Sequence, residues 1–155
     1  MSIRHCLVGP VYLMLLSGSF GCTMSGSDDR ARLMKEVDTT LTYPMVAEDI
    51  SKHVGKRVAW HGLQIGGDPT KEIEHYTYMP TAKNSGVDFE KPFMFNRSDG
   101  KDMRNDAQKK VNDKHRQLII GTISGSGEFK YQTGNVKKQI TAPVLTDVSI
   151  LGPEK

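Results

Sequence analysis

Hydrophobic and polar residues alternate along most of the chain after residue 56 with the two-residue period of β-strands. The pattern predicts five strands, at 57–65, 72–79, 92–95, 117–124 and 138–151. In the first strand the alternation changes face between Trp60 and Leu63, which favours a β-bulge at Gly62. Turn residues gather at 66–70 and 125–127, and Pro143 predicts an edge or a bend in the fifth strand.

Two segments carry apolar residues at every fourth position, which indicates amphipathic helices. They are 45–54, with Val46, Ile50 and Val54, and 101–116, with Met103, Ala107 and Val111. The order of helix, three strands, helix and two strands is that of the OB-fold, a five-stranded Greek-key barrel. We therefore expect a mainly β protein: a small five-stranded antiparallel OB-like barrel with a helix between strands 3 and 4 and a short N-terminal helix. A small open antiparallel sheet covered by one helix is the alternative.

The N-terminus carries a short export signal. Arg4 provides positive charge, and the apolar run at 7–20 is shorter than the roughly 20 residues that cross a bilayer and is interrupted by Pro10. Cys22 follows Gly21 at the end of this run and resembles the lipid-attachment cysteine of bacterial lipoproteins. The resemblance implies a lipoprotein-type signal peptide at 1–21 and acylation of Cys22, with chains such as palmitate. An ordinary secretory leader cut nearby is the alternative.

The composition after cleavage limits the classes of partner. From Cys22 on, the chain contains 20 Lys and Arg residues and 18 Asp and Glu residues, so its net charge is only +2. A duplex-binding domain concentrates more positive charge, because neutralised phosphates supply most of its affinity. We expect a polar tether at 22–42, with a short helical piece around 31–37, and one OB-like β-barrel domain at 43–155.

Two segments resemble the Slp-type outer-membrane lipoproteins. The segment 53–62, with the sequence His-Val-Gly-Lys-Arg-Val-Ala-Trp-His-Gly, is similar to the Val-Gly-x-x-x-x-aromatic-Gly-Gly entry strand of that family. The segment 118–125 is similar to its later Gly-Thr-Ile strand. His61 stands where the family has its first glycine, and 66–114 offers no matching motif. The resemblance implies an outer-membrane lipoprotein, and Thr23 after the cysteine fits that sorting.

Aromatic and basic residues on the first strands are the best candidates for a binding face. Trp60, Tyr76 and Tyr78 would form a stacking platform, together with Phe93 or Phe95. The basic residues expected nearby are Lys56, Arg57, Lys130, Lys137 and Lys138. The alternative is that Trp60 and the phenylalanines belong to the core. Tyr76 and Tyr78 share a strand face with Glu72 and Glu74, so we expect that face to be exposed to solvent. The carboxylates beside the tyrosines would repel phosphate, so we do not expect nucleic acid as a partner.

Catalytic and metal-binding motifs are not recognisable in the sequence. Of the histidines, only His61 and His75 are weak candidates for a metal site, through a meeting across strands, because no pair has the close spacing typical of zinc ligands. We expect no cofactor. The body holds no nucleophile motif and no phosphate loop, so we do not expect an enzyme.

The features combine into a functional hypothesis. We expect a lipoprotein held by its N-terminal lipid at the periplasmic face of the outer membrane, acting as a non-catalytic binding or structural accessory of the cell envelope with an envelope protein or glycan as partner. One alternative is an OB-fold protein that binds oligosaccharides or single-stranded nucleic acid. The other is a metal-binding envelope protein.

Overall fold

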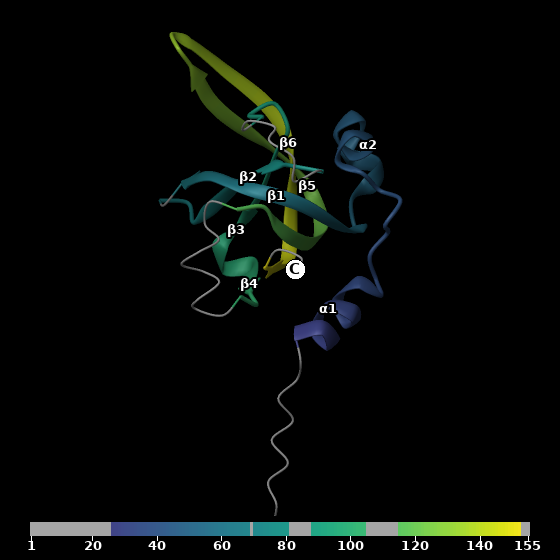
Figure 1. Cartoon of the computed structure of the whole chain (residues 1–155). Helices are drawn as coiled ribbons and strands as arrows, with labels where there is room; N and C mark the ends of the chain where they lie inside the picture. The colour runs from purple at the N-terminus through teal and green to yellow at the C-terminus, as the bar shows by residue number, and fades with distance from the viewer. Residues whose placement is uncertain (1–25, 69, 81–87, 105–114, 153–155) are drawn as a thin grey trace, which may run out of the picture.

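The computed structural model describes residues 26–68, 70–80, 88–104 and 115–152 (Figure 1). The strands in this part of the chain are β1 (Arg57–Asp68), β2 (Ile73–Tyr78), β3 (Pro92–Asn96), β4 (Gly100–Asp102), β5 (Gln117–Thr133) and β6 (Val136–Leu151). The helical segments are α1 (Gly26–Met34), α2 (Tyr43–Glu48) and the short 3-10 helices η1 (Ile50–His53) and η2 (Arg97–Asp99). Strands hold 55% of the described residues, which confirms the expected mainly β class.

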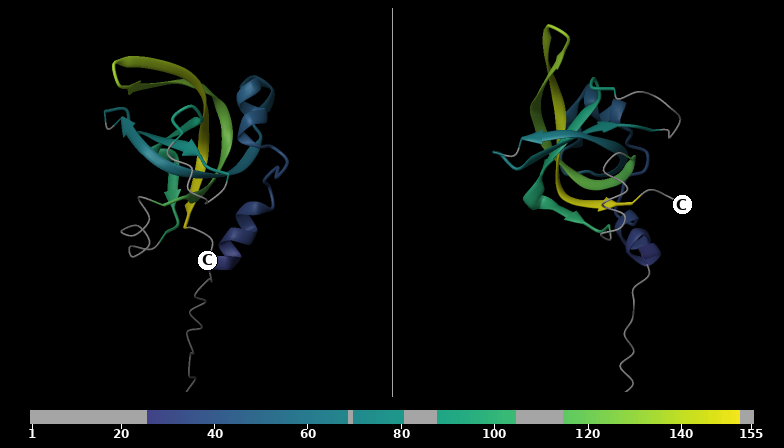
Figure 2. Two further views of the ribbon diagram at one scale, coloured as in Figure 1. Left: turned by 45° about the horizontal axis from the view of Figure 1, so that its top comes forward. Right: turned by 60° about the vertical axis from the view of Figure 1, so that its left-hand side comes forward.

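Five strands close into a barrel in the order β3-β2-β1-β5-β6, and β6 returns to pair with β3 (Figure 2). Outside this ring, β4 adds a sixth strand beside β6. The expected wholly antiparallel barrel is wrong, because β6 runs parallel to both β3 and β4. Strand directions can alternate all the way around a closed ring only when the number of strands is even, so a five-stranded ring must contain a parallel pair.

Large aromatic and branched side chains fill the barrel. β1 contributes Val58 and Trp60 to this core, and β3 contributes Phe93 and Phe95. The indole N–H of Trp60 donates a hydrogen bond to the backbone carbonyl of Leu41 at 3.0 Å. The polar edge of the largest core side chain is therefore satisfied, as burial requires.

The bulge in β1 lies beyond the expected position. The pairing of β1 is regular up to Gly62 with β5 and from Gly62 to Gln64 with β2, so the predicted bulge at Gly62 is wrong. The register of β1 against β2 shifts further on, between Gln64 and Gly66. Gly62 has a different role, since a Cβ atom there would lie only 2.7 Å from Cζ of Phe93. The missing side chain lets β1 and β3 close over the core.

The predicted turn at 125–127 is wrong, because β5 continues through it to Thr133. The pairing of β5 with β6 shifts in register between Ile123 and Gly125, so these glycines form an irregularity within the strand rather than a reversal. The hairpin turns after Thr133, where Gly134 has a φ of +58°. In the described part of the chain, residues 126–143 pair only with each other, and we call them the arm (Figure 1).

The expected N-terminal helix at 45–54 is split into two short pieces, α2 and η1. Val46 and Ile50 are buried as predicted, whereas Val54 is exposed beyond the end of η1. The helix expected at 101–116 falls mostly outside the described residues, and its start is occupied by strand β4 instead. None of the helices in the described ranges is long and apolar enough to cross a membrane.

The expected tether at 22–42 is described from residue 26 on, and this part contacts the barrel. The helical piece expected around 31–37 corresponds to α1, which starts earlier in the chain. Leu33, Met34 and Val37 pack against a small cluster formed by Leu118, Ile120 and Leu151. The chain from Leu33 onward therefore contributes apolar contacts to the outer surface of the barrel.

Candidate ligand-binding site

The aromatic residues predicted to form a stacking platform are brought together, but they lie inside the barrel. Trp60 and Tyr76 are each only 2% exposed, and Tyr78 packs against the same core. Stacked or edge-on ring contacts join Trp60 to Phe93 and Tyr76 to Phe95. The expectation that Tyr76 faces water is therefore wrong, because β2 pairs with β1 on one side and β3 on the other and closure of the barrel encloses this face. Tyr78, near the end of the strand, is partly buried.

The basic residues fall into two separate groups. Arg57 at the start of β1 donates to the carboxylate of Asp147 at 2.6 Å, next to Lys56. Arg57 pairs with Thr122 of β5, and Lys130 lies eight residues further along that strand. At 3.3 Å per residue, the length of strand between Thr122 and Lys130 is about 26 Å. Lys56 and Arg57 consequently do not share a surface with the lysines of the arm, which include Lys137 and Lys138.

His61 and His75 are not brought together across β1 and β2. The backbone carbonyl of His61 accepts a hydrogen bond from the amide of Met79, whereas His75 stands opposite Gly66, five residues further along β1. In the ranges that the structure covers, no three His, Cys, Asp or Glu side chains are grouped so that they could hold a metal ion.

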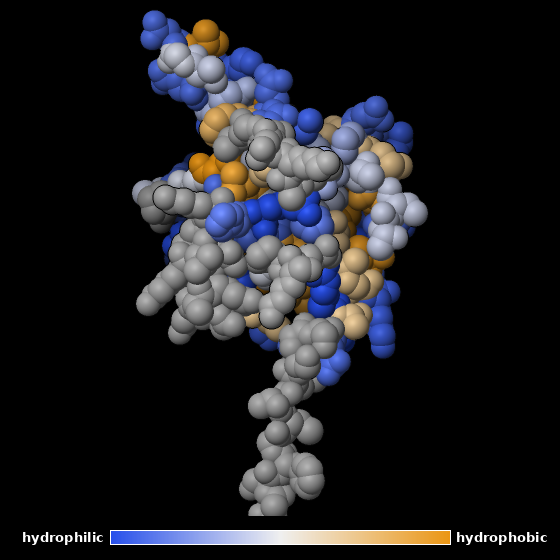
Figure 3. Space-filling view, in the orientation of Figure 1, coloured by the Kyte–Doolittle hydropathy of each residue, from blue (hydrophilic) through white to orange (hydrophobic). Residues whose placement is uncertain are grey.

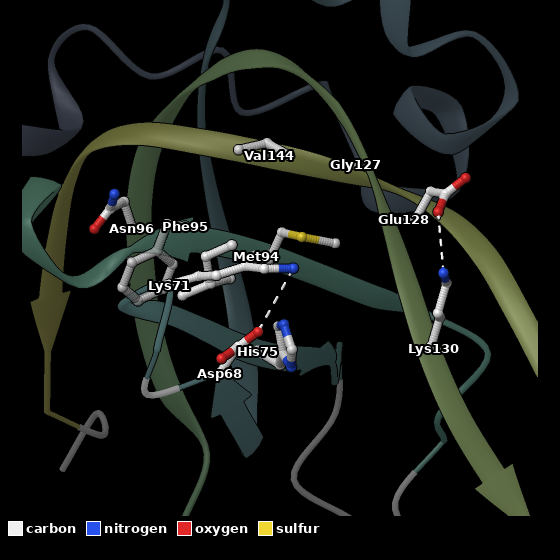
Figure 4. Close-up of a pocket in the computed structure, with 11 residues that line it drawn as sticks. Asp68, Lys71, His75, Met94, Phe95, Asn96, Gly127, Glu128, Lys130 and Val144 are labelled. Carbon is white, nitrogen blue, oxygen red and sulfur yellow. Dashed lines mark ion pairs between the residues drawn. The ribbon is translucent and has the colours of Figure 1, made fainter.

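A hollow with a volume of about 640 Å³ lies between the arm and the outer surface of β2 and β3 (Figure 4). Small-molecule sites usually have volumes of roughly 300–1,000 Å³. The side chains and backbone that line the hollow come from five elements and the β1–β2 connection: Asp68, Lys71, Ile73, His75, Met94, Phe95, Asn96, Gly127, Glu128, Lys130 and Val144. Apolar groups thus form the floor, and charged groups stand around them.

The arm is fixed to the body of the molecule by a second apolar cluster outside the barrel. Phe129 and Ala142 of the arm pack on Met94 of β3. Further out, the ring of Tyr131 stacks between Phe129 and Phe89, with centroid distances of 5.6 and 5.7 Å. On the face shown in Figure 3, hydrophobic side chains gather where the arm joins the body. These contacts hold the arm over β2 and β3 and keep the hollow open between them.

His75 links the hollow to this cluster. Its ring meets the ring of Phe129 edge-on at a centroid distance of 5.2 Å. Burial lowers the pKa of His75 below its ordinary value, although the nearby carboxylates of Asp68 and Glu74 act in the opposite direction. The imidazole is therefore neutral at pH 7, with one ring nitrogen that donates a hydrogen bond and one that accepts.

Acidification is expected to loosen the arm through His75. The pKa of His75 is lower in the folded chain than its ordinary 6.5, so the unfolded chain binds the proton more readily. The contribution of neutral His75 to stability is complete above pH 6.5 and is lost as the pH falls below it. Urea unfolding at pH 7.5 and 5.5 measures this loss, and His75→Gln should reduce it. An equal loss of stability in both proteins would contradict the assignment.

A smaller hollow of about 270 Å³ lies beside a charged cluster around Glu74 and the start of β4. Glu74 is 9% exposed, and its carboxylate accepts hydrogen bonds from the side chains of Arg97 and Gln64. Asp102 accepts from Arg104 through both carboxylate oxygens. These contacts neutralise the buried charges, so we assign the cluster to the structure of the barrel rather than to binding.

Of the residues that line the hollow, the sequence indicates His75, Phe95 and Lys130 as candidates for a site and does not single out the others. Asp68 falls in the predicted turn at 66–70, Met94 falls in a predicted strand, and Lys71 lies between the turn and the strand predicted at 72–79. The signal for the arm is present in 128–132, where Phe129 and Tyr131 alternate with polar residues. Extending that alternation beyond the glycines would have predicted the continued strand.

No protein-family model, curated protein or solved structure matches the chain. The resemblance to the Slp-type lipoproteins therefore stays a prediction.

Proposed function

We propose that this protein is a lipid-anchored accessory of the bacterial cell envelope that binds a partner in the hollow beneath the arm. Residues 1–21 direct export, and acylated Cys22 holds the mature chain at the periplasmic face of the outer membrane. The protein acts by binding and not by catalysis. Neither a metal ion nor another cofactor is needed for this activity.

The observation that carries the proposal is the position of the arm relative to α1. The two lie at opposite ends of the molecule in every view (Figures 1 and 2). Helix α1 begins at Gly26, four residues after Cys22, and four residues reach at most about 14 Å. An anchor at Cys22 would therefore keep the α1 end close to the bilayer and direct the arm and its hollow toward the periplasm.

The order of the strands, compared with that of the OB-fold, supports the same surface as the binding face. In an OB-fold, ligands bind on the second and third strands, between the connection of strands 1 and 2 and that of strands 4 and 5. Here β2 and β3 provide that face, Asp68 and Lys71 lie at the β1–β2 connection, and the arm is the last connection. We propose that the barrel is OB-like in this sense. Because fold alone does not determine function, this likeness only adds to the position of the arm and its hollow opposite α1.

Site-specific photo-crosslinking in living cells tests the proposal. A benzophenone amino acid at position 130, on the wall of the hollow, is expected to form one defined covalent adduct with an envelope protein or glycan. The matched control carries the same group in place of Met45, which is exposed on α2 and is not one of the residues that line the hollow. Absence of an adduct at position 130, or the same adduct from both positions, would overturn the proposed binding site.

A further inference from the structure

We infer that the hollow binds an uncharged oligosaccharide, an inference that rests on the proposed function because it names the ligand of that same site. The apolar face of a sugar ring would lie on Ile73 and Val144, which are only partly buried and line the hollow. Its hydroxyl groups would donate to the carboxylates of Asp68 and Glu128 and exchange hydrogen bonds with His75.

The charges around the hollow favour a ligand without net charge. Two carboxylates and two ammonium groups line it, and they form the ion pairs Asp68–Lys71 at 3.7 Å and Glu128–Lys130 at 3.5 Å. The formal charge of the lining residues therefore sums to zero, since His75 is neutral. Single-stranded nucleic acid binds in grooves with excess positive charge, and an acidic polymer would gain nothing from this balance.

Both ion pairs are open to exchange with a ligand. The side chains of Lys71 and Lys130 are 71% and 68% exposed, so water screens their attraction to the carboxylates. A sugar hydroxyl can take the place of either ammonium group and donate to the carboxylate. Hydrogen bonds to an ionised acceptor are shorter and stronger than those between neutral groups, so a hydroxyl group that donates to either carboxylate makes a strong contact.

The floor of the hollow matches the apolar side of a sugar ring. Ile73 of β2 and Val144 of β6 are its partly exposed apolar side chains, and next to them Met94, which pairs with His75, is buried at 4% exposure. Its polarizable thioether adapts to irregular apolar surfaces. Gly127 stands above it on the arm, and a Cβ atom there would lie 3.2 Å from the Met94 sulfur. The absence of a side chain at residue 127 therefore lets the backbone of the arm pack closely against Met94.

Calorimetric titration of the lipidated mature protein in nanodiscs tests the inference, with empty nanodiscs as the blank. The probes are chitotetraose, cellotetraose and maltotetraose, and an octamer of thymidine is the acidic competitor. We expect one-to-one binding of at least one tetrasaccharide and little binding of the thymidine octamer. The double variant Asp68→Asn, Glu128→Gln should weaken the binding by about tenfold or more, because two charge-assisted hydrogen bonds are lost.

The variants are chosen to preserve the fold. The substitution Asp68→Asn keeps a side-chain oxygen that can accept hydrogen bonds from the amide and hydroxyl of Thr70, as the carboxylate does. Lys137→Gln, near the tip of the arm and outside the hollow, is the matched control and should bind as the original chain does. The temperature of unfolding, measured for each protein, identifies any variant that has lost its structure.

The outcomes separate the two proposals. Failure of all three tetrasaccharides to bind, tighter binding of the thymidine octamer, or undiminished binding by a folded double variant would overturn the sugar ligand. If a defined adduct still forms at position 130 in cells, only the ligand class is wrong. If neither the sugars nor the crosslinker gives a signal, the proposed function fails as well.

Discussion

Replacing Trp60 with alanine is expected to lower the free energy of unfolding by about 3–5 kcal/mol, the usual cost of removing a large aromatic side chain from a core. Trp60 is almost fully buried, and its ring contacts those of Tyr43, Tyr78 and Phe93 at centroid distances of 5.4, 6.4 and 5.6 Å. The total stability of a small domain is about 5–15 kcal/mol, so the variant should be close to unfolding. Urea unfolding followed by circular dichroism measures the change.

The variant Trp60→Phe separates packing from hydrogen bonding. Phenylalanine keeps most of the apolar contact but cannot donate to the carbonyl of Leu41. We expect a smaller loss of stability and faster amide exchange in 38–43, the segment that this hydrogen bond helps to hold. A loss for Trp60→Ala no larger than for exposed Met45→Ala would contradict the buried position of Trp60. Since Trp60 is the single tryptophan, blue-shifted emission provides an independent check.

Replacing Cys22 with alanine is expected to release the protein from the membrane. Each buried methylene of an acyl chain contributes about 0.8 kcal/mol to attachment, and stable attachment takes more than one chain. Without the acyl chains, the protein should move from the membrane fraction to the soluble periplasmic fraction, and labelling with palmitate should cease. Fractionation after a high-salt wash measures both effects.

Cys6, the other cysteine of the chain, provides the matched control for this experiment. Cys6→Ala removes a thiol from the expected signal peptide and should leave both attachment and labelling intact. Retention of the Cys22→Ala protein in the washed membrane fraction would show that another part of the chain binds the bilayer, and the account of the anchor would then be wrong.

The strands were the most predictable part of the fold because alternation is a local property of the sequence. The ends of β2 and β3 fall within one residue of the predicted segments 72–79 and 92–95. The parallel pairing of β3 with β6 was missed because it follows from closure of the ring, which no short segment encodes. The glycines at 125–127 predict a turn wrongly, because the permissive backbone of glycine serves a bulge as well as a reversal.

The candidate site was less predictable than the fold. Tyr76 and Tyr78 share a strand face with Glu74, and a glutamate usually marks a wet surface. The structure buries Glu74 because Arg97, 23 residues away in the chain, neutralises it. The hollow escaped prediction for a similar reason: Asp68, Met94 and Glu128 lie on separate elements and meet only when the arm folds over β2 and β3.

Intact-mass spectrometry of the protein purified from washed membranes shows whether Cys22 anchors the chain. We expect a mature chain that begins at Cys22 and exceeds the polypeptide mass by that of its acyl groups. An unmodified chain that begins at any other residue would contradict it, because the α1 end would then lack the anchor that directs the arm and its hollow toward a partner.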